Sequence, residues 1–441
     1  MPALVALDEI RPAAGPPILT RAREESAQRL MMAYAITGLF FMLLPGTFLG
    51  VWNLLSISGG HASAISTAWI QAHGHAQIFG WIGTFILGIG FYSIPKLTSG
   101  RVQQAMMGWT AWTLWTSGVL LRWASGFYHL YWRTLLPLSA VLELAGFAIF
   151  LVSVSRHRAP RPSGQSERAP VWIISVLIGT AGFGAALLLN LVLAIYVSLY
   201  NTGPAFPLIF EARFLVLVSY AFIVPTVWGF SARWLPVFLG LKPLRDRWLR
   251  YALLLSIAGV LLAVTGFTPA AHWVIVAAAA IAVAAFRLLE QPAQKSKTTG
   301  VHPVFPAFVR IAYIWMAIAA ALGVCAVYYD HAHGWIGASR HALTVGFVST
   351  MVFAIGQRVL PAFAGMRVLY SPRLMLVCLL LLNLGCMLRV SSEILAYENY
   401  WPSAWHVLPW SAILELSAVT VFAANMLLTF KQPPAHLRAA E

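Results

Sequence analysis

The chain has 441 residues, of which 60% are hydrophobic and 10% are charged. An average soluble domain is about 25% charged, so this composition indicates a membrane protein and excludes a disordered chain, a disulfide-rich secreted protein and a soluble enzyme. The net charge is +15, and the three cysteines lie in apolar stretches without a Cys-x-x-Cys motif. The sequence therefore gives no sign of a redox dithiol or of covalently attached haem.

Twelve apolar stretches long enough to cross a bilayer follow one another along the chain. They lie near residues 30–51, 67–93, 105–125, 133–154, 170–200, 208–232, 248–267, 272–289, 304–329, 336–361, 373–391 and 403–430. They predict one all-α membrane domain at 30–430. A polar segment at 1–29, which is not typical of a cleavable signal peptide, precedes it, and a tail at 431–441 follows it.

The basic residues indicate how this domain is oriented. The terminal segments and the even-numbered connections carry 24 of the 29 Lys and Arg residues. Because cytoplasmic loops collect Lys and Arg, both termini are predicted to be cytoplasmic. Topology and contact with the lipid bilayer then explain the basic excess, and no nucleic acid is expected. Five arginines on the outer side need another explanation: Arg122, Arg133, Arg213, Arg340 and Arg389.

The sequence also contains an internal repeat. At an offset of 266 residues, the second apolar stretch matches the tenth, and the next two stretches continue the match after small insertions. The matched pairs include His75 and His341, Thr84 and Thr350, Pro95 and Pro361, Arg122 and Arg389, and Glu143 and Glu415. A fainter copy at 233–240 resembles 358–365. The repeat predicts three pseudo-symmetric units of four helices, near 30–154, 170–289 and 304–430.

Two histidines occupy matching positions in this repeat. His75 and His341 each lie 20 residues before a matched proline. That separation is about 30 Å of helix, the thickness of the hydrocarbon core, so both are predicted at one depth near its outer edge. Two imidazoles at one depth can approach a flat macrocycle from opposite faces, as the axial ligands of haem iron do. The pattern predicts a haem b between them; the simpler alternative is that each forms only an interface hydrogen bond.

Other charged side chains fit the same hypothesis. Arg122, Arg389 and Arg340 are candidates to hold haem propionates, because guanidinium groups bind carboxylates strongly; contact with lipid headgroups or helix-end carbonyls is the alternative. Glu143 and Glu415 lie about ten residues into matched helices, near mid-membrane. A lone carboxylate there is paired or neutral, so each is predicted either to relay protons or to form structural hydrogen bonds.

The remaining histidines have weaker support. His73 lies about 200° around the helix from His75, so it is expected to face a second metal or haem, or only to form a hydrogen bond. In the segment Asp330-His331-Ala332-His333, His331 and His333 are candidate ligands for copper or zinc, although the segment is more typical of a solvated loop.

These motifs resemble the NnrS family of haem- and copper-containing inner-membrane proteins, which are linked to nitric oxide stress and denitrification. The family pattern His-x-His, followed by Leu/Ile-Phe-Gly, matches His73-Gly74-His75 and Ile78-Phe79-Gly80, and its His-Ala-Leu-Thr-Val-Gly block matches 341–346. The acidic residue that usually follows His-x-His is Ala76 here, so no role of that carboxylate is expected. The resemblance implies a bacterial inner-membrane protein that binds haem and copper.

More distantly, the chain resembles the catalytic subunit of haem–copper oxidases and nitric oxide reductases, which has twelve helices in three arcs. In that family, histidines of the second and tenth helices hold a low-spin haem, and His75 and His341 match them. The copper ligands do not carry over. Ser339 stands where the oxidases have a further histidine, Val216 stands at the sixth-helix counterpart of His341, and 208–232 and 248–267 contain no histidine. An oxygen-reducing haem–copper centre is therefore not expected.

Residues and resemblance together predict a haem-binding membrane protein of nitric oxide or nitrosative-stress metabolism. Nitric oxide is the expected ligand, and a quinol or a periplasmic protein is the expected electron donor. The alternatives are a quinol-linked or nitric-oxide-consuming oxidoreductase subunit and a twelve-helix transporter without haem. Transporters usually consist of two six-helix halves with helices broken at the midplane, so units of four helices favour the cofactor hypothesis. No catalytic residue is assigned.

Overall fold

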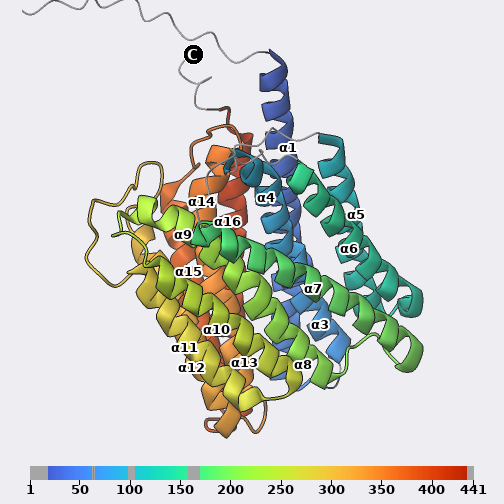
Figure 1. Ribbon diagram of the computed structural model, residues 1–441. Coiled ribbons are helices and arrows are strands. Elements are labelled where there is room, and N and C mark those ends of the chain that lie inside the picture. Colours follow the sequence, from blue (N-terminus) through green and yellow to red (C-terminus); the bar gives the residue numbers. More distant parts are fainter. Residues whose placement is uncertain (1–17, 62, 64, 98–104, 157–168, 435–441) are drawn as a thin grey trace, which may run out of the picture.

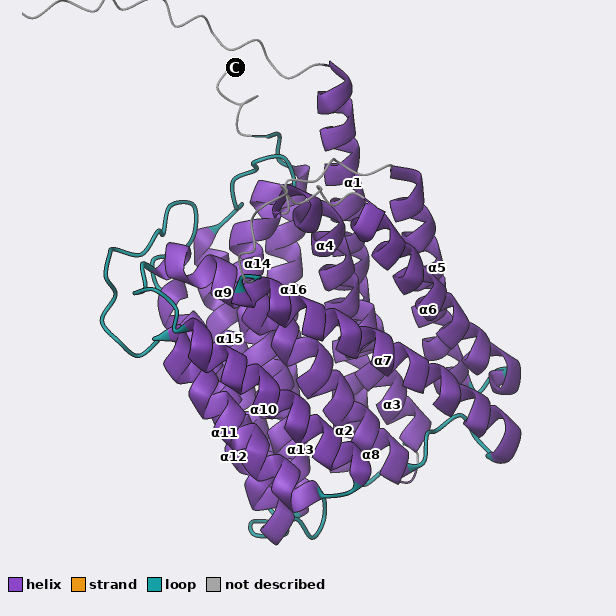
Figure 2. Cartoon of the chain, in the orientation of Figure 1, coloured by secondary structure: helices purple, strands orange, loops and turns teal. Residues whose placement is uncertain are grey.

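The computed structural model describes residues 18–61, 63, 65–97, 105–156 and 169–434. The predicted terminal segments at 1–29 and 431–441, and the basic connection at 156–168, therefore lie partly outside the described residues. In the part of the chain that is described, every regular element is a helix (Figures 1 and 2), which confirms the predicted all-α fold class.

The described helices form twelve rods, as the apolar stretches predict. Eight rods are single α-helices: α5 (Ala105–Tyr128), α6 (Trp132–Arg156), α7 (Val171–Tyr200), α10 (Asp246–Thr265), α11 (Thr268–Phe286), α12 (Phe305–Tyr329), α15 (Pro372–Tyr397) and α16 (Ala404–Lys431). The other four rods, the first, second, sixth and tenth in chain order, each contain a π-helical segment between two α-helices.

The first such rod consists of α1 (Ile18–Phe41), η1 (Met42–Phe48) and α2 (Leu49–Ser58), and the second consists of α3 (Thr67–His75), η3 (Ala76–Gly83) and α4 (Thr84–Leu97). The sixth consists of α8 (Leu208–Leu217), η4 (Val218–Ile223) and α9 (Val224–Leu239), and the tenth of α13 (Gly334–His341), η5 (Ala342–Ser349) and α14 (Thr350–Phe363). In the first rod Pro45, which has no N–H to donate, lies inside the π segment.

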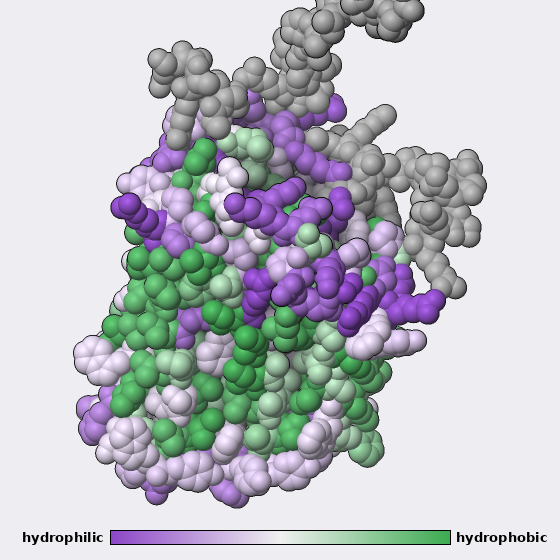
Figure 3. All heavy atoms as spheres, turned by 90° about the vertical axis from the view of Figure 1, so that its left-hand side faces the viewer, coloured by the Kyte–Doolittle hydropathy of each residue, from purple (hydrophilic) through white to green (hydrophobic). Residues whose placement is uncertain are grey.

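Eleven of these rods are long and apolar enough to cross a membrane. The remaining rod, α5, is long enough, but its tryptophans and threonines lower its hydropathy; it packs along α6. Figure 3 shows the consequence on one face of the molecule, where an apolar band lies between more polar ends. Large exposed apolar side chains on the spanning helices include Leu254 and Leu261 of α10 and Ile314 of α12. The chain is a multi-pass membrane protein.

The sequence repeat has a counterpart in local structure. The segments η3 and η5 begin directly after His75 and His341, and each is followed by a threonine whose hydroxyl donates back to a carbonyl inside the segment. Thr84 donates to the Phe79 carbonyl at 3.4 Å and Thr350 to the Val345 carbonyl at 3.5 Å. Such π segments widen a helix locally and are frequent at functional sites.

Candidate cofactor-binding site

A cavity of about 440 Å³ lies between the helices of the first and third repeat units and α8. Ligand and cofactor sites are typically about 300–1,000 Å³, so the cavity is of a suitable size. All four π segments contribute to its wall, through Thr47, Gln77, Ser219 and Thr344 among others. The three predicted histidines of the second and tenth rods also line it. The internal repeat thus brings its matched histidines to one cavity.

His341 is held at the end of α13 by two acceptors. Its Nδ1 lies 3.0 Å from the Gly337 carbonyl oxygen and 2.8 Å from Oε2 of Glu393 on α15. Gly337 permits this approach, because a Cβ there would lie 2.5 Å from Oε1 of Glu393. With Nδ1 placed against acceptors, the proton of a neutral imidazole belongs on Nδ1 and the Nε2 lone pair is left for a ligand.

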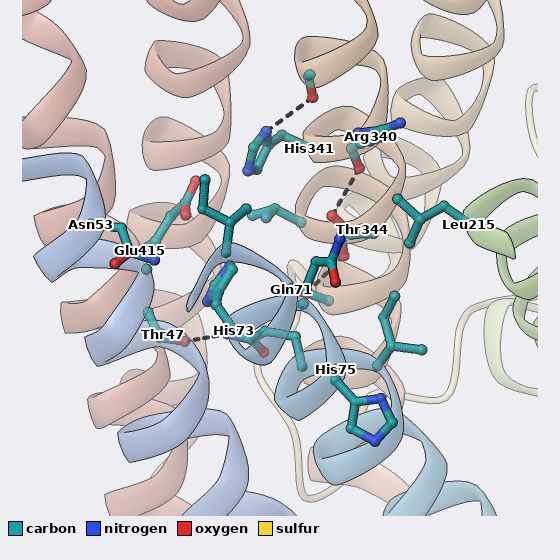
Figure 4. Close-up of a pocket in the computed structure, with 18 of the residues that line it drawn as sticks. Thr47, Asn53, Gln71, His73, His75, Leu215, Arg340, His341, Thr344 and Glu415 are labelled. Carbon is teal, nitrogen blue, oxygen red and sulfur yellow. Dashed lines mark hydrogen bonds between the residues drawn. The ribbon is translucent and has the colours of Figure 1, made fainter. Parts of the chain in front are cut away.

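His73 has a similar arrangement on the second rod. Its Nδ1 lies 2.8 Å from the Gly46 carbonyl oxygen of η1. The ring packs over Gly50 of α2, where a Cβ would come within 2.6 Å of the imidazole Cε1. His341 and Arg389 line the same cavity as His73. In Figure 4 His73 and His341 lie toward Thr47, Asn53 and Glu415, on one side of the cavity.

His75 points away from this pair, as its offset along the helix predicts (Figure 4). Its Nε2 lies 2.8 Å from Oε1 of Glu143 on α6, and its ring stacks on Phe79 with the centroids 4.6 Å apart. The side chain of Glu143 is fully buried and that of His75 nearly so. The nitrogen of His75 that faces Glu143 is therefore already engaged within the protein.

The predicted arginines divide between the two sides of the cavity. Arg389 lies beside the His73 and His341 pair and contacts Glu393 at 3.4 Å, while its Nε has no hydrogen-bond partner among the described residues. Arg122 and Arg340 instead share an electrostatic neighbour, Glu211 of α8. The structure thus brings all three arginines to the cavity, although not to one point on its wall.

The predicted carboxylates also have different environments. Glu143 pairs with His75, whereas the matched Glu415 lies on the cavity wall with Oε1 buried and without a hydrogen-bond partner among the described residues. Two further acids, Glu211 and Glu393, were not selected from the sequence. Glu211 is the only acid within 208–232, and Glu393 follows Arg389 by one helical turn. Treating every carboxylate inside a predicted membrane helix as a candidate functional residue would have found both.

The loop that holds His331 and His333 is organised by its backbone. Glu398 accepts N–H bonds from His331, Ala332 and Gly334 at 2.9–3.2 Å. His333 lies 3.6 Å from Asp330 and also lines the cavity. Among the described residues there is no group of three or more His, Cys, Asp or Glu side chains that could hold a metal ion. The two histidines thus stay candidate copper ligands.

Hydroxyl, sulfur and aromatic contacts join the tenth rod to its neighbours on the side away from the cavity-lining histidines. Ser339 donates to the Ala319 carbonyl at 2.8 Å, and the indole of Trp228 donates to the Met316 sulfur at 3.3 Å. Tyr313 packs edge-on against Phe347, with ring centroids 5.2 Å apart. These contacts link the sixth, ninth and tenth rods, and Ser339 stands where the oxidases have a further histidine.

Comparisons with known proteins support the fold and leave the activity open. A family model described as a domain of unknown function (DUF8744) matches residues 210–430, half of the chain. No curated protein matches the chain. A cryo-EM structure of a heme-copper terminal oxidase dimer matches with a TM-score of 0.56 and 14% identity, over 93% of this chain and 85% of that chain. The fold is therefore similar to that of the oxidase, whereas the resemblance to NnrS stays a prediction.

Proposed function

The chain belongs to the family described as a domain of unknown function (DUF8744), and we propose that this member is a haem-binding membrane protein that carries electrons in nitric oxide or nitrosative-stress metabolism. The proposed cofactor is a haem b held between the second and tenth rods. His341 provides one axial ligand, and a histidine of His73-Gly74-His75 provides the other. A haem iron supplies reversible one-electron transfer when it is bound by two such imidazoles.

One observation carries this proposal: two imidazoles from different rods line one cavity, and each directs Nδ1 to a protein acceptor. These are His341, with Gly337 and Glu393, and His73, with Gly46. Metal-bound histidines almost always donate their other ring N–H to a carboxylate or a backbone carbonyl, which fixes the ring and raises its basicity. The surroundings of both side chains therefore suit axial ligation through Nε2.

The choice between His73 and His75 rests on the same hydrogen bonds. His75, the partner expected from the repeat, uses its Nε2 for Glu143 and would have to give up that bond or bind through Nδ1. His73 lines the same cavity as His341, its Nδ1 faces the Gly46 carbonyl, and it needs no such exchange. We therefore propose His73 as the second ligand and assign His75 to a separate pair with Glu143.

The charged groups on the wall fit the two propionates of a haem. Arg389 lies beside His73 and His341, and its buried Nε has no hydrogen-bond partner among the described residues. The Nη2 of Arg389 already donates to Glu393, but a buried N–H without an acceptor is costly, and a further carboxylate would satisfy the Nε. Arg389 is thus the residue best placed to hold a propionate; Arg340 and Arg122 are the further candidates.

The physiological part of the proposal rests on the NnrS-like motifs. An iron with two axial histidines is coordinatively saturated, which suits electron transfer from a quinol or a periplasmic donor. Binding of nitric oxide requires one ligand to leave or a second site. A quinol-linked or nitric-oxide-consuming oxidoreductase subunit is the second candidate, favoured by the fold similarity to a terminal oxidase. Copper at His331 and His333 is a further proposal.

The test is an absorption spectrum with metal analysis of protein purified after haem-sufficient expression. We expect a Soret band with the signature of a six-coordinate, low-spin haem, lost in His341→Ala and in His73→Ala but kept in His75→Ala. Wild-type protein without a Soret band would contradict haem binding and favour the transporter. If the six-coordinate signature is lost in His75→Ala and kept in His73→Ala, His75 and not His73 is the second axial ligand.

Two glycine variants check the ligand without removing a histidine. Gly50→Ala places a methyl group against the His73 ring, so it should disturb the six-coordinate signature. Gly74→Ala is the comparison: apart from its chain neighbours His73 and His75, a Cβ at that position meets nothing within 4 Å, although Gly74 also lines the cavity. Equal spectra for the two variants would argue against His73.

A further inference from the structure

A polar cluster on the side of the cavity opposite to Glu415 is not used by the proposed haem ligands. It consists of Gln71 on α3, Arg122 on α5, Phe206, Glu211 on α8 and Arg340 on α13, all of which line the cavity. We call these five residues the lateral site. Its members come from three different repeat units, so the site exists only in the assembled bundle. Figure 4 shows Gln71 and Arg340 on this side.

Gln71 fixes the geometry of the lateral site. Its amide nitrogen donates to the Phe206 carbonyl at 2.9 Å and to Oε2 of Glu211 at 2.8 Å, and its amide oxygen accepts the Phe206 N–H at 2.7 Å. Both backbone groups of Phe206 are therefore bonded to Gln71. Glu211 is therefore held in place by an amide, and its carboxylate is not free to swing onto a guanidinium without breaking this network.

Arg122 is the group that lacks a partner. The residue is 2% exposed, its guanidinium lies over the Phe206 ring at 4.7 Å, and its Nε and Nη1 have no acceptor among the described residues. Glu143 and Glu211 are close enough to interact electrostatically, but neither forms an ion pair with it within the described part of the chain. A buried cation without a bonded acceptor is unfavourable by several kcal/mol, so an acceptor is needed.

The unused donors of Arg122 favour an anion as that acceptor. Glu211 interacts electrostatically with Arg122 and Arg340, and Glu143 interacts with Arg122 while its Oε1 is hydrogen-bonded to His75. None of these carboxylates accepts from the buried Nε and Nη1 of Arg122 among the described residues. A planar guanidinium binds planar oxyanions through two parallel hydrogen bonds, and Phe206 covers the other face of Arg122.

We infer that the lateral site binds a small planar oxyanion, of the size of nitrate or a one-carbon carboxylate, between Arg122 and Arg340. The inference goes beyond the proposed haem and does not require it. The same chemistry could come from a second source, a haem propionate that reaches across the cavity. The free anion is favoured because the proposed axial ligands, His73 and His341, lie toward Glu415 on the other side of the cavity (Figure 4).

The experiment measures the binding of sodium nitrate to the purified full chain by calorimetry, at constant ionic strength with gluconate as the balancing anion. Protein from haem-deficient and from haem-sufficient expression is compared. We expect saturable binding of nitrate to both preparations. Binding to the haem-free preparation alone would assign the site to a propionate, and no saturable binding to either would overturn the inference.

Two arginine variants and one control locate the site. Arg122→Gln should weaken nitrate binding by about tenfold or more, as expected for the loss of charged hydrogen bonds. Since Arg122 is deeply buried, Arg340→Gln provides a second, less buried variant with the same expected direction. Arg133→Gln is the control, because Arg133 donates to the carbonyls of Ser198 and Asn201 away from the cavity. Equal affinities for all three variants would overturn the assignment.

Discussion

The imidazole Nε2 of His75 lies 2.8 Å from Oε1 of Glu143, and this buried pair joins α3 to α6 within the first repeat unit. The matched residues of the third unit, His341 and Glu415, form no such hydrogen bond. His341 instead contacts Glu393, which lies on α15, the helix that precedes the one carrying Glu415. Equivalent residues thus have different partners. The Nε2 of His75 is bonded to Glu143, whereas His341 uses Nδ1 for its contacts and keeps Nε2 for a ligand in the cavity.

The first prediction concerns this pair. Glu143→Ala removes the acceptor of a buried imidazole, so the free energy of unfolding should fall by about 1–3 kcal/mol. Glu143→Gln, which keeps the shape and an acceptor oxygen, should cost less. Thermal unfolding in detergent measures both. Glu415→Ala is the comparison, since Glu415 has a buried oxygen without a partner among the described residues. A larger loss for Glu415→Ala would contradict a structural role of the Glu143 pair.

The second prediction concerns Glu393, which we assign as a positioning residue for His341. A carboxylate that accepts the Nδ1–H of an axial histidine makes the ring a stronger donor and favours the oxidised metal. Glu393→Gln should therefore keep the haem but raise its midpoint potential in a redox titration followed by absorption. Glu415→Gln controls for charge alone, because Glu415 interacts electrostatically with His341 without a hydrogen bond to it. Equal shifts of the midpoint potential in Glu393→Gln and Glu415→Gln would show that Glu393 acts through its charge alone.

Much of the fold could be predicted because it depends on periodic and compositional signals. Apolar length predicts the rods, and the repeat predicts which rods correspond. The structure agrees in detail: Ser139 and Ser411, matched in sequence, each donate to a carbonyl three residues earlier, at 2.7 and 2.6 Å. These features depend on contacts within one helix or between neighbouring helices, so the order of residues in the sequence is enough to predict them.

The partners of the site residues could not be predicted in the same way. Depth along a helix follows from counting residues, but the rotation of a side chain toward one neighbour depends on packing between units. Glu393 has Gly126 at its matched position in the first unit, so the repeat gives no hint that it replaces Glu415 beside His341. Glu211 is held by Gln71 from a different unit, a contact that no sequence spacing contains.

The third prediction concerns two matched glycines, Gly118 and Gly385. A Cβ at Gly118 would lie 2.7 Å from Cγ of Glu143, and one at Gly385 would lie 2.9 Å from Cγ of Glu415. Alanine at either position should lower the free energy of unfolding by about 1–3 kcal/mol, as overpacking does. Gly74→Ala is the control, since its Cβ meets nothing and alanine favours a helix. Comparable losses for all three variants would show that general helix effects dominate.

The last prediction concerns pH and the loop that holds His331 and His333, outside the membrane-spanning segments. Partial burial acts to raise the pKa of Glu398, but N–H donation from the backbone of His331, Gly334 and Ala332 outweighs it, so the pKa lies below its ordinary value. A carboxyl group with a lowered pKa stabilises the folded loop above the ordinary pKa, and this contribution is lost as the pH falls through the lowered value.

Amide hydrogen exchange of residues 331–334, corrected for intrinsic rates, measures this effect. Protection should be constant from pH 7 to about 5, because an ordinary glutamate titrates near pH 4.3, and should fall at lower pH. Glu398→Gln should remove most of that protection already at pH 7, whereas amides within α12 should keep theirs in both proteins. Constant protection across the whole range in wild-type protein would show that Asp330, which also caps this turn through the Trp335 N–H, holds the loop without Glu398.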